Sequence, residues 1–297
     1  MAYKNIFIEN NCKLSTKDKQ LIILKEIEYS IPLEDINMII IDDVACNIST
    51  KLISKLSEND ILVYICDNKH LPKTIILKIN SYSRKLKRLK QQLSLPKPVI
   101  KRMWQSIIKQ KIINQSKSLE NLNIKDYTEL YNLSYNVQSG DSDNIEAVAA
   151  AMYFRKLNFN RGNNDSFINS ALNYGYAIVR GMICRTLVSY GFEPCIGLFH
   201  HNELNNFNLA DDIIECFRPL VDLYILSNIS QHENELTPNI KKVIMNVTNQ
   251  IMLIDNKKYN IQTAIDQMIM SLSTSVSTKS NSLKLPVLTN LEEYIYG

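Results

Sequence analysis

The spacing of apolar residues changes near residue 80, and this change constrains the fold more than any other feature of the chain. Before it, short β-branched runs are separated by polar turns, which is the pattern of strands. These runs are KNIFIEN (4–10), QLIILK (20–25), INMIIID (36–42), ILVYICD (61–67) and TIILKI (74–79). One amphipathic helix interrupts them at 49–60, with Ser49 as its candidate N-cap. We therefore predict a small β-rich domain over residues 1–80.

Beyond residue 98 the apolar residues recur mostly at helical spacing. The helical segments are 104–115, 144–157, 167–190 and 210–229. The segment 247–272 predicts a hairpin around Asn256 followed by an amphipathic helix. The predicted fold class is α+β, with the small N-terminal β-rich domain followed by a larger all-α domain over 99–297. Residues 81–98 form a basic helix or linker, which LPKP at 95–98 breaks. The Ser/Thr-rich stretch at the start of residues 273–297 predicts a flexible tail.

Membrane insertion and a disulfide framework are not expected. No run approaches ~18 consecutive apolar residues, which is the length that a membrane-spanning helix needs. The N-terminal MAYKNIFIENN lacks the long apolar core of a signal peptide. The six cysteines are dispersed and contain no C-x-x-C pair, which favours reduced thiols over disulfides or a structural zinc site. These features together predict a cytoplasmic protein.

Basic residues are concentrated in one part of the chain. From Asn68 to Leu119 there is no Asp or Glu, while the same stretch holds fourteen Lys and Arg. Since the whole chain carries +4, the remainder carries about −10. A solvated helix surface is the plainer explanation, but such surfaces usually interleave both signs, so we favour a surface for a polyanion such as nucleic acid. The candidate DNA-binding residues are Arg84, Lys85, Lys87, Arg88, Lys97, Lys101 and Arg102.

A short acidic helix is predicted after the histidine pair at 200–201. Asn208 is its candidate N-cap, and Pro219 is expected to end it. On a helical wheel Asp212 borders the apolar stripe and Glu215 lies one turn further on, whereas the neighbouring Asp211 points to the opposite side. Two carboxylates at this spacing disfavour each other, and a cation between them would remove that cost.

Glu146 is the only acid on a second predicted helix, at 144–157, and it projects from a face of small and apolar residues. A carboxylate in such a place is costly unless it is paired or bound to a cation. The alternative is that Glu146 complements the helix dipole from the first turn. Tyr153 lies seven residues later on the same face, so it is expected to lean over the site.

His200 and His201 precede the acidic helix directly. Imidazole and carboxylate groups without a nearby thiolate make a hard ligand set, which suits Mg²⁺ or Mn²⁺ better than a structural zinc. Taken alone, a histidine pair in a loop is more typical of surface or hydrogen-bonding residues than of metal ligands. The residues by themselves therefore leave the role of the pair open.

Several segments together resemble one family. They are IEAVAAAMYF, ALNYGYAIV and GLFHHNELNNFNLADDIIECFRPLVD, set in the same order of strands followed by helices. The chain resembles CRISPR-associated protein one, the integrase and endonuclease of spacer acquisition, in its type II variant. The resemblance implies an N-terminal dimerisation domain and a C-terminal catalytic domain. It implies Glu146, His200 and Glu215 as catalytic metal ligands for Mg²⁺ or Mn²⁺, with Asp212 and Tyr153 in support, and His201 as a neighbour on the DNA surface or a residue without a role.

The activity implied by the resemblance is the insertion of short foreign DNA into a CRISPR array by attack of a 3′-hydroxyl on a phosphodiester. The implied partners are double-stranded DNA (the prespacer and the CRISPR repeat), a second copy of the chain and the small second CRISPR adaptation protein. Type II relatives add the effector nuclease and a ring-forming accessory protein. Two other functions stay open from the residues, namely a stand-alone metal-dependent nuclease of branched or single-stranded DNA and a non-catalytic DNA-binding scaffold.

Overall fold

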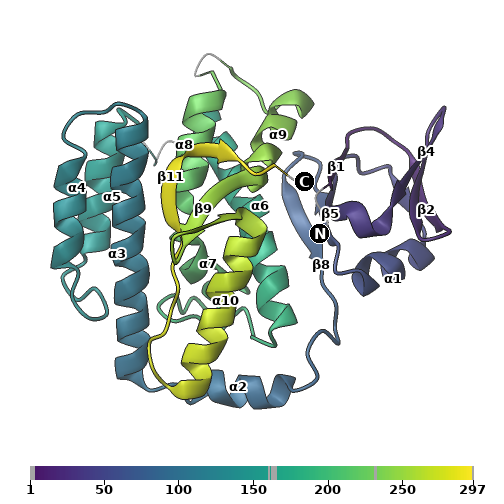
Figure 1. The fold of residues 1–297 in the computed structure, drawn as a ribbon. Coiled ribbons are helices and arrows are strands. Elements are labelled where there is room, and N and C mark those ends of the chain that lie inside the picture. The colour runs from purple at the N-terminus through teal and green to yellow at the C-terminus, as the bar shows by residue number, and fades with distance from the viewer. Residues whose placement is uncertain (1–3, 160, 162–165, 231–232, 296–297) are drawn as a thin grey trace. The chain divides into compact units, whose positions relative to one another are not determined.

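The computed structural model describes residues 4–159, 161, 166–230 and 233–295. The chain divides into two compact units, one formed by residues up to Ser81 and the other by Tyr82–Ile295. The first unit is rich in strands and the second is mainly helical (Figure 1). This order of a strand-rich region followed by a helical region is the one that the change in apolar spacing predicts.

The first unit contains two four-stranded sheets, with orders β1-β5-β7-β8 and β4-β3-β2-β6. In the first sheet β1, β5 and β7 are parallel, and β8 runs antiparallel to β7. The second sheet is an antiparallel meander of β2, β3 and β4, with the short β6 parallel to β2. The elements are β1 (Lys4–Ile8), β2 (Lys13–Lys17), β3 (Gln20–Leu24), β4 (Glu28–Pro32), η1 (Leu33–Asp35), β5 (Ile36–Ile41), β6 (Asn47–Ile48), α1 (Thr50–Glu58), β7 (Leu62–Cys66) and β8 (Pro72–Ile76).

The local predictions for this unit are confirmed where the apolar pattern is strong. All five predicted runs contain strands, and Ser49 caps α1 by accepting a hydrogen bond from the backbone N–H of Leu52. The strands that were missed are β2, β4 and β6, whose sequences KLSTK, EYSIP and NI are short or carry few apolar residues. Pairing with neighbouring strands, rather than local composition, makes these segments extended.

The second unit is built around α3, which contacts α4, α5 and α8 (Figure 1). Its apolar residues pack against these neighbours, and helix α6 contacts α7, α8, α9 and α10 in turn. The helices are α2 (Lys85–Leu93), α3 (Lys97–Asn121), α4 (Thr128–Leu133), η2 (Ser134–Asn136), α5 (Ile145–Lys156), α6 (Phe167–Ser189), α7 (Asn208–Ile214), α8 (Arg218–Asn228), α9 (Pro238–Met245), η3 (Asn246–Asn249) and α10 (Ile261–Thr278).

The second unit is not all-α, contrary to the prediction. It contains a three-stranded antiparallel sheet in the order β10-β9-β11, formed by β9 (Gln250–Ile254), β10 (Lys257–Asn260) and β11 (Val287–Glu293). The hairpin predicted around Asn256 is the connection between β9 and β10, and the amphipathic helix predicted after it is α10. The third strand, β11, also contacts α3.

The prediction of a flexible tail from Ser273 is wrong for the described residues. Helix α10 continues through Thr278, and β11 then pairs with the buried strand β9. The serine and threonine hydroxyls are satisfied within the helix, as where the Ser275 hydroxyl donates to the carbonyl oxygen of Ser271 at 2.8 Å. A Ser/Thr-rich composition indicates mobility only where no neighbouring element offers such packing.

Two expected boundaries also differ. Residues 81–98 are not a simple linker, because they contain helix α2 and the start of α3. Pro219 does not end the acidic helix, which stops at Ile214, but lies in the first turn of α8, where proline loses no hydrogen bond. Asn208 does not cap α7. Its side-chain amide instead donates to the carbonyl oxygens of Cys195 and Asn202, at 3.0 and 2.9 Å, and so ties down the preceding loop.

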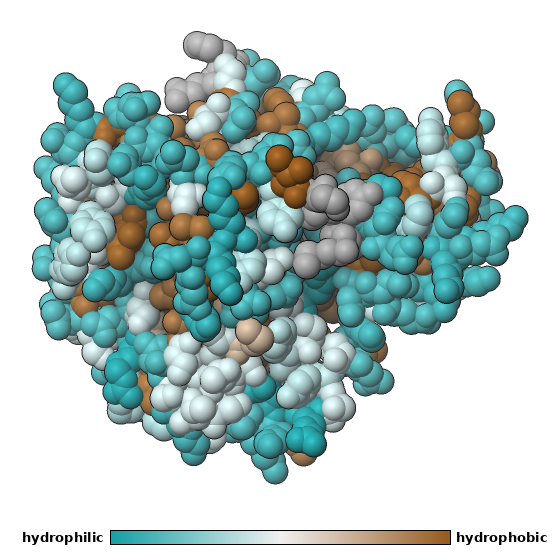
Figure 2. Space-filling model, viewed as in Figure 1, coloured by the Kyte–Doolittle hydropathy of each residue, from teal (hydrophilic) through white to brown (hydrophobic). Residues whose placement is uncertain are grey.

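Hydrophilic residues cover most of the face shown in Figure 2, and the apolar residues on it form separate patches. Among the described residues, no helix is both long enough and apolar enough to cross a membrane.

Candidate functional site

Helix α3 brings a buried lysine to two of the carboxylates that the sequence singles out. The ammonium of Lys111 lies 2.7 Å from Oε1 of Glu146 and 2.5 Å from Oε2 of Glu215. Lys111 is only 8% exposed. Burial by itself would lower the pKa of the Lys111 ammonium, but the carboxylates of Glu215 and Glu146 outweigh burial and raise it. The ammonium is therefore charged at neutral pH and joins the two carboxylates.

Glu146 is placed by the local structure that starts α5. The carboxylate of Asp141 accepts the backbone N–H groups of Ile145 and Glu146, at 2.9 and 3.1 Å, and so satisfies donors that the first turn of the helix leaves free. Glu146 lies in that first turn, where its carboxylate complements the helix dipole, and it also pairs with the Lys111 ammonium. Both interactions expected from the sequence are therefore present.

Glu215 lies in the turn between α7 and α8 and is 5% exposed. Its Oε1 accepts a hydrogen bond from Nε of Arg218 at 2.8 Å, and its Oε2 meets Lys111. Burial alone would raise the pKa of Glu215, but the Arg218 guanidinium and the Lys111 ammonium outweigh it and lower the pKa to about 2. Glu215 is therefore a buried carboxylate that stays ionised because two cations hold it.

His200 lies against Asp212, which is fully buried. The carboxylate of Asp212 accepts the backbone N–H groups of Leu198, Phe199 and His200, at 2.5, 3.1 and 3.2 Å, and meets Nδ1 of the His200 ring at 2.7 Å. An ionised carboxylate can only accept, so Nδ1 carries the proton and Nε2 of a neutral ring presents its lone pair. Asp212 thus sets both the position and the tautomer of His200.

Gly197 makes this arrangement possible. A Cβ atom at this position would collide with the carbonyl oxygen of His200 and would approach Oδ2 of Asp212 to 2.8 Å. Only a residue without a side chain lets the loop wrap this closely around the carboxylate.

The imidazole of His200 is also held by aromatic rings. Trp104, which is 1% exposed, stacks on Phe199 with ring centroids 4.4 Å apart. The His200 ring stands nearly perpendicular to both, with centroids 5.8 Å from Trp104 and 5.6 Å from Phe199. Trp104 is thus a buried residue of the core that also packs against the candidate histidine.

The hydrogen bond to Asp212 is the main cause of a raised pKa at His200, with burial opposing it. Glu215 also raises the pKa of His200 by Coulomb attraction, so the two groups interact electrostatically. His201 is exposed beside this loop. The two histidines therefore have different surroundings, since His200 is held by Asp212 and His201 is exposed.

The expected cation fits these groups in part. Glu146 and Glu215 suit a cation because they already share one, the Lys111 ammonium. No group of three or more His, Cys, Asp or Glu side chains that could hold a metal ion occurs among the described residues. The expectation that Asp212 and Glu215 share a cation is wrong. Helix α7 ends between them, and they bind separate partners, His200 for Asp212 and both Lys111 and Arg218 for Glu215.

Tyr153 does not lean over the carboxylates. It is fully buried, and its hydroxyl lies 3.0 Å from the hydroxyl of Ser118. Another buried carboxylate, Asp222 of α8, accepts a hydrogen bond from Tyr176. Burial is the main reason that the pKa of Asp222 rises to about 6. The sequence reasoning did not identify Asp222, which lines a small cavity together with Arg218.

The sequence reasoning also missed Lys111, which belongs to the basic run that was assigned to the surface. A signal for it exists in the sequence. Lys111 lies seven residues after Trp104, so both lie on the same face of α3, and Ile107, Ile108 and Ile112 surround that face with buried apolar residues. A lone lysine inside an apolar stripe requires a buried partner.

The candidate DNA-binding residues separate into two kinds. Arg88 is buried, and its guanidinium donates to the carbonyl oxygens of Tyr190 and Ser273, at 3.3 and 3.2 Å, and to the hydroxyl of Ser277 at 3.2 Å. Its expected role in DNA binding is therefore wrong, because its donors are used inside the protein. The others are exposed, namely Arg84, Lys85, Lys87, Lys97, Lys101 and Arg102.

The chain matches the family described as CRISPR associated protein Cas1 over residues 6–256. The CRISPR-associated endonuclease Cas1 of Neisseria meningitidis serogroup C (strain 8013) is 40% identical over 304 residues, with 100% of both chains covered. A casposase bound to integration product has a similar fold, with a TM-score of 0.79, 20% identity and coverage of 95% of this chain and 92% of that one. A chain of a Cas6-RT-Cas1–Cas2 complex matches with a TM-score of 0.71, 19% identity and coverage of 94% of this chain and 35% of that one.

Proposed function

The chain belongs to the Cas1 family of CRISPR-associated proteins, and we propose that it is a metal-dependent DNA endonuclease and integrase that inserts short DNA segments into a CRISPR array. Full-length similarity to a Cas1 endonuclease supports the nuclease activity, and the casposase fold is consistent with integration. The reaction is a transesterification, in which a 3′-hydroxyl of the incoming DNA attacks a phosphodiester of the target.

One observation carries the catalytic part of the proposal. Glu146 comes from α5 and Glu215 from the turn between α7 and α8, and the fold brings both to a single buried cation. Burying carboxylates costs several kcal/mol each unless they are paired, so a fold that collects two of them at one place has a specific use for negative charge there. We propose that Glu146 and Glu215, with His200 as the third ligand, hold Mg²⁺ or Mn²⁺.

When bound, the cation would lower the pKa of the attacking hydroxyl and neutralise charge at the phosphorus centre. The protein's own groups prepare the site. Asp212 holds the proton on Nδ1 of His200, which leaves Nε2 free to ligate. Arg218 donates a hydrogen bond to Oε1 of Glu215, while Oε2 of Glu215 faces the Lys111 ammonium.

The exposed cations of α2 and the first half of α3 would bind DNA phosphates without reading sequence. We further propose a homodimer that assembles with Cas2, which the fold shared with a chain of a Cas1–Cas2 complex supports. The type II assignment, with its effector nuclease and ring-forming accessory protein, remains part of this proposal.

The test is strand transfer of a short labelled duplex into a plasmid that carries the repeat, with Mn²⁺, with Mg²⁺ and with chelator. We expect Glu146→Ala, His200→Ala and Glu215→Ala each to abolish joined products while the His201→Ala control stays active. Nicked products without joined products would favour the stand-alone nuclease. Full activity of His200→Ala alongside an inactive His201→Ala would overturn the ligand assignment.

A further inference from the structure

The charges around Lys111 are already balanced without any metal. The ammonium and the Arg218 guanidinium supply two positive charges, and Glu146 and Glu215 supply two negative ones. A divalent cation added to this set would lie directly beside a buried ammonium, and like charges this close repel strongly where water is excluded. Lys111 therefore cannot keep its present position between the two carboxylates when a divalent cation binds there.

A cavity adjoins the Lys111 side chain. Its volume is about 180 Å³, and it is lined by Lys111, Glu215, Arg218, Gln115 and Asp222 among others. Gln115 follows Lys111 by one turn of α3, so the two side chains are neighbours on the helix surface. Oε1 of Gln115 is buried and is one of few such atoms that lack a hydrogen-bond partner among the described residues. A buried acceptor without a donor is costly, and an ammonium is a donor of the kind it lacks.

We propose that Lys111 is a resident counter-ion that occupies the cation position between Glu146 and Glu215, and that a divalent cation binds there by displacing the ammonium toward Gln115. This inference rests on the proposed metal site and adds to it a residue that sets how tightly the metal binds. Without metal, Lys111 keeps the half-buried carboxylate of Glu146 and the buried carboxylate of Glu215 paired. With metal, the ammonium leaves the carboxylates and satisfies Oε1 of Gln115, with the carboxylate of Asp222 in the same cavity.

The proposal assigns opposite effects to two neighbouring residues of α3. Lys111→Met removes the competing charge while keeping an unbranched side chain. The metal-free protein should then lose stability because the two carboxylates repel each other, whereas Mn²⁺ should bind about tenfold more tightly or better. Gln115→Leu removes only the acceptor for the displaced ammonium. The metal-free protein should keep its stability, and Mn²⁺ should bind several-fold more weakly.

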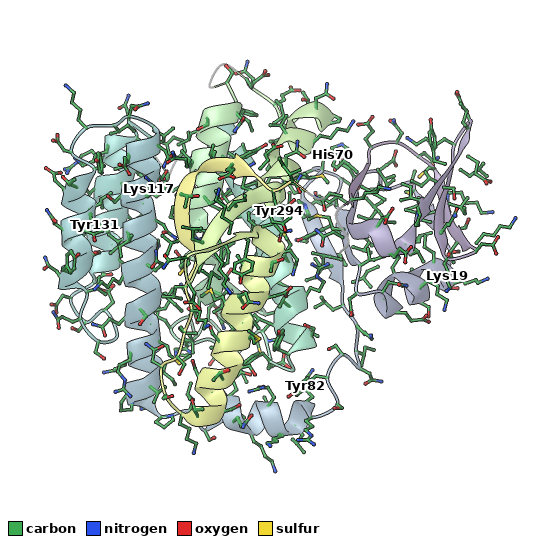
Figure 3. The ribbon with its side chains drawn as sticks, in the orientation of Figure 1. Lys19, His70, Tyr82, Lys117, Tyr131 and Tyr294 are labelled. Carbon is green, nitrogen blue, oxygen red and sulfur yellow. The ribbon has the colours of Figure 1, made fainter. Side chains whose placement is uncertain are left out.

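The matched control is Lys117→Met. Lys117 lies on the same helix, labelled in Figure 3, and forms an ion pair of 2.7 Å with Glu120. That pair is partly exposed and outside the site, so its loss should leave both the melting temperature and the Mn²⁺ affinity near those of the parent protein.

The experiment uses the full chain freed of metal by chelation. The Mn²⁺ dissociation constant is measured from the electron paramagnetic resonance signal of free Mn²⁺, and the melting temperature is measured with and without Mn²⁺. Equal or weaker Mn²⁺ binding by Lys111→Met would overturn the proposal, as would unchanged Mn²⁺ binding by Gln115→Leu. If Lys111→Met does not fold without metal, Lys111→Gln takes its place, because it removes the charge and can still form hydrogen bonds with the carboxylates. Tighter Mn²⁺ binding than by the parent protein is expected, and equal binding contradicts the proposal.

The same measurements separate this inference from the proposed function. If the parent protein binds no Mn²⁺, or if Glu146→Gln binds Mn²⁺ as tightly as the parent, the proposed metal site itself is wrong. If the parent protein binds Mn²⁺ through Glu146, but Lys111→Met and Gln115→Leu leave Mn²⁺ binding unchanged, the metal site stands. Only the proposed exchange between the metal and the Lys111 ammonium is then wrong.

Discussion

Trp104 and Lys111 lie two turns apart on the same face of α3, and each holds a different half of the candidate site. The ring of Trp104 packs edge-on against His200 at 5.8 Å, while the ammonium of Lys111 binds the two glutamates. Seven residues span nearly two turns of a helix, so the two side chains project in nearly the same direction. A single rigid helix therefore sets the spacing between the histidine and the carboxylates, and changes on this face should affect both.

Replacing Glu215 should reduce stability in a way that depends on pH. Since its folded-state pKa is about 2 against an ordinary value of 4.5, the charged group stabilises the fold above pH 4.5 and loses that contribution as the pH falls toward 2. Glu215→Gln should cost on the order of 3 kcal/mol at neutral pH and progressively less below pH 4.5. Urea unfolding at several pH values measures this, with Glu120→Gln as the exposed control. A constant difference across the pH range would contradict the ion-pair explanation.

Asp212→Asn should lower the pKa of His200, because the hydrogen bond to Asp212 is the main cause of its rise. The folded-state pKa lies above the unfolded value, so the charged pair stabilises the fold below the unfolded pKa and loses this contribution as the pH rises through the folded pKa. The stability lost in Asp212→Asn should therefore be larger in mild acid than in mild alkali. Histidine resonances in an NMR titration report the pKa, and Asp211→Asn should shift it much less. An unmoved His200 resonance would rule out Asp212 as the cause.

Gly197→Ala should damage the histidine loop. The added Cβ would collide with the carbonyl oxygen of His200 and crowd the carboxylate of Asp212, and neither backbone nor a buried carboxylate can move away cheaply. We expect a loss of about 2 kcal/mol or more together with impaired strand transfer. Cys195→Ala, at an exposed position of the same loop, is the control. A fully stable and active Gly197→Ala would mean that the loop tolerates another path around Asp212.

Arg88 and Arg84 should behave in opposite ways, although they are one helical turn apart. Arg88→Met removes buried hydrogen bonds to Tyr190, Ser273 and Ser277 and should cost about 3 kcal/mol. Arg84→Met, at an exposed position, should change stability by less than about 0.5 kcal/mol. Thermal and urea unfolding check this. Equal losses for the two variants would show that Arg88 is not an internal structural residue.

The exposed cations should control how DNA binding responds to salt. Combined substitution of Lys87, Lys101 and Arg102 by Ala should weaken duplex binding and reduce the salt slope by about 0.9 for each phosphate that the protein no longer neutralises. Thermal stability and Mn²⁺ binding should stay unchanged. Binding titrations at several salt concentrations measure the slope, with Lys258→Ala on the β9–β10 hairpin as control. An unaltered slope would place the DNA surface elsewhere.

Much of the fold follows from local pattern. The β-branched runs became strands, Ser49 caps α1 as expected, and Asn256 lies at the hairpin between β9 and β10. The elements that were not predicted from the sequence share a cause. Strand β11 has an unremarkable local sequence and exists because β9 offers an edge for pairing, and the serine-rich end of α10 is helical because it packs. Local composition does not contain the partner that makes such segments ordered.

In the candidate site, too, residue identity could be predicted from the sequence and the pairing of side chains could not. Glu146, His200 and Glu215 were singled out by residue type, helical spacing and the family motif, while Asp212 was expected to support them. Helical spacing predicts Asp212 and Glu215 on one helix with a shared cation, but α7 ends at Ile214, before Glu215. The chain turns between α7 and α8 instead, which sends Asp212 to His200 and Glu215 to Lys111.

The sequence by itself determined most of the helices, the strands with a strong apolar pattern and the side chains that carry charge, because apolar periodicity and residue chemistry act over a few neighbouring residues. Only the tertiary structure decided which charges meet. The ammonium of Lys111 finds Glu146 and Glu215 because α3 packs against α5 and α8, and Arg88 turns inward to the end of α10. Coulomb and hydrogen-bond energies depend on distance in space and on exclusion of water, and spacing along the chain specifies neither for groups on different helices.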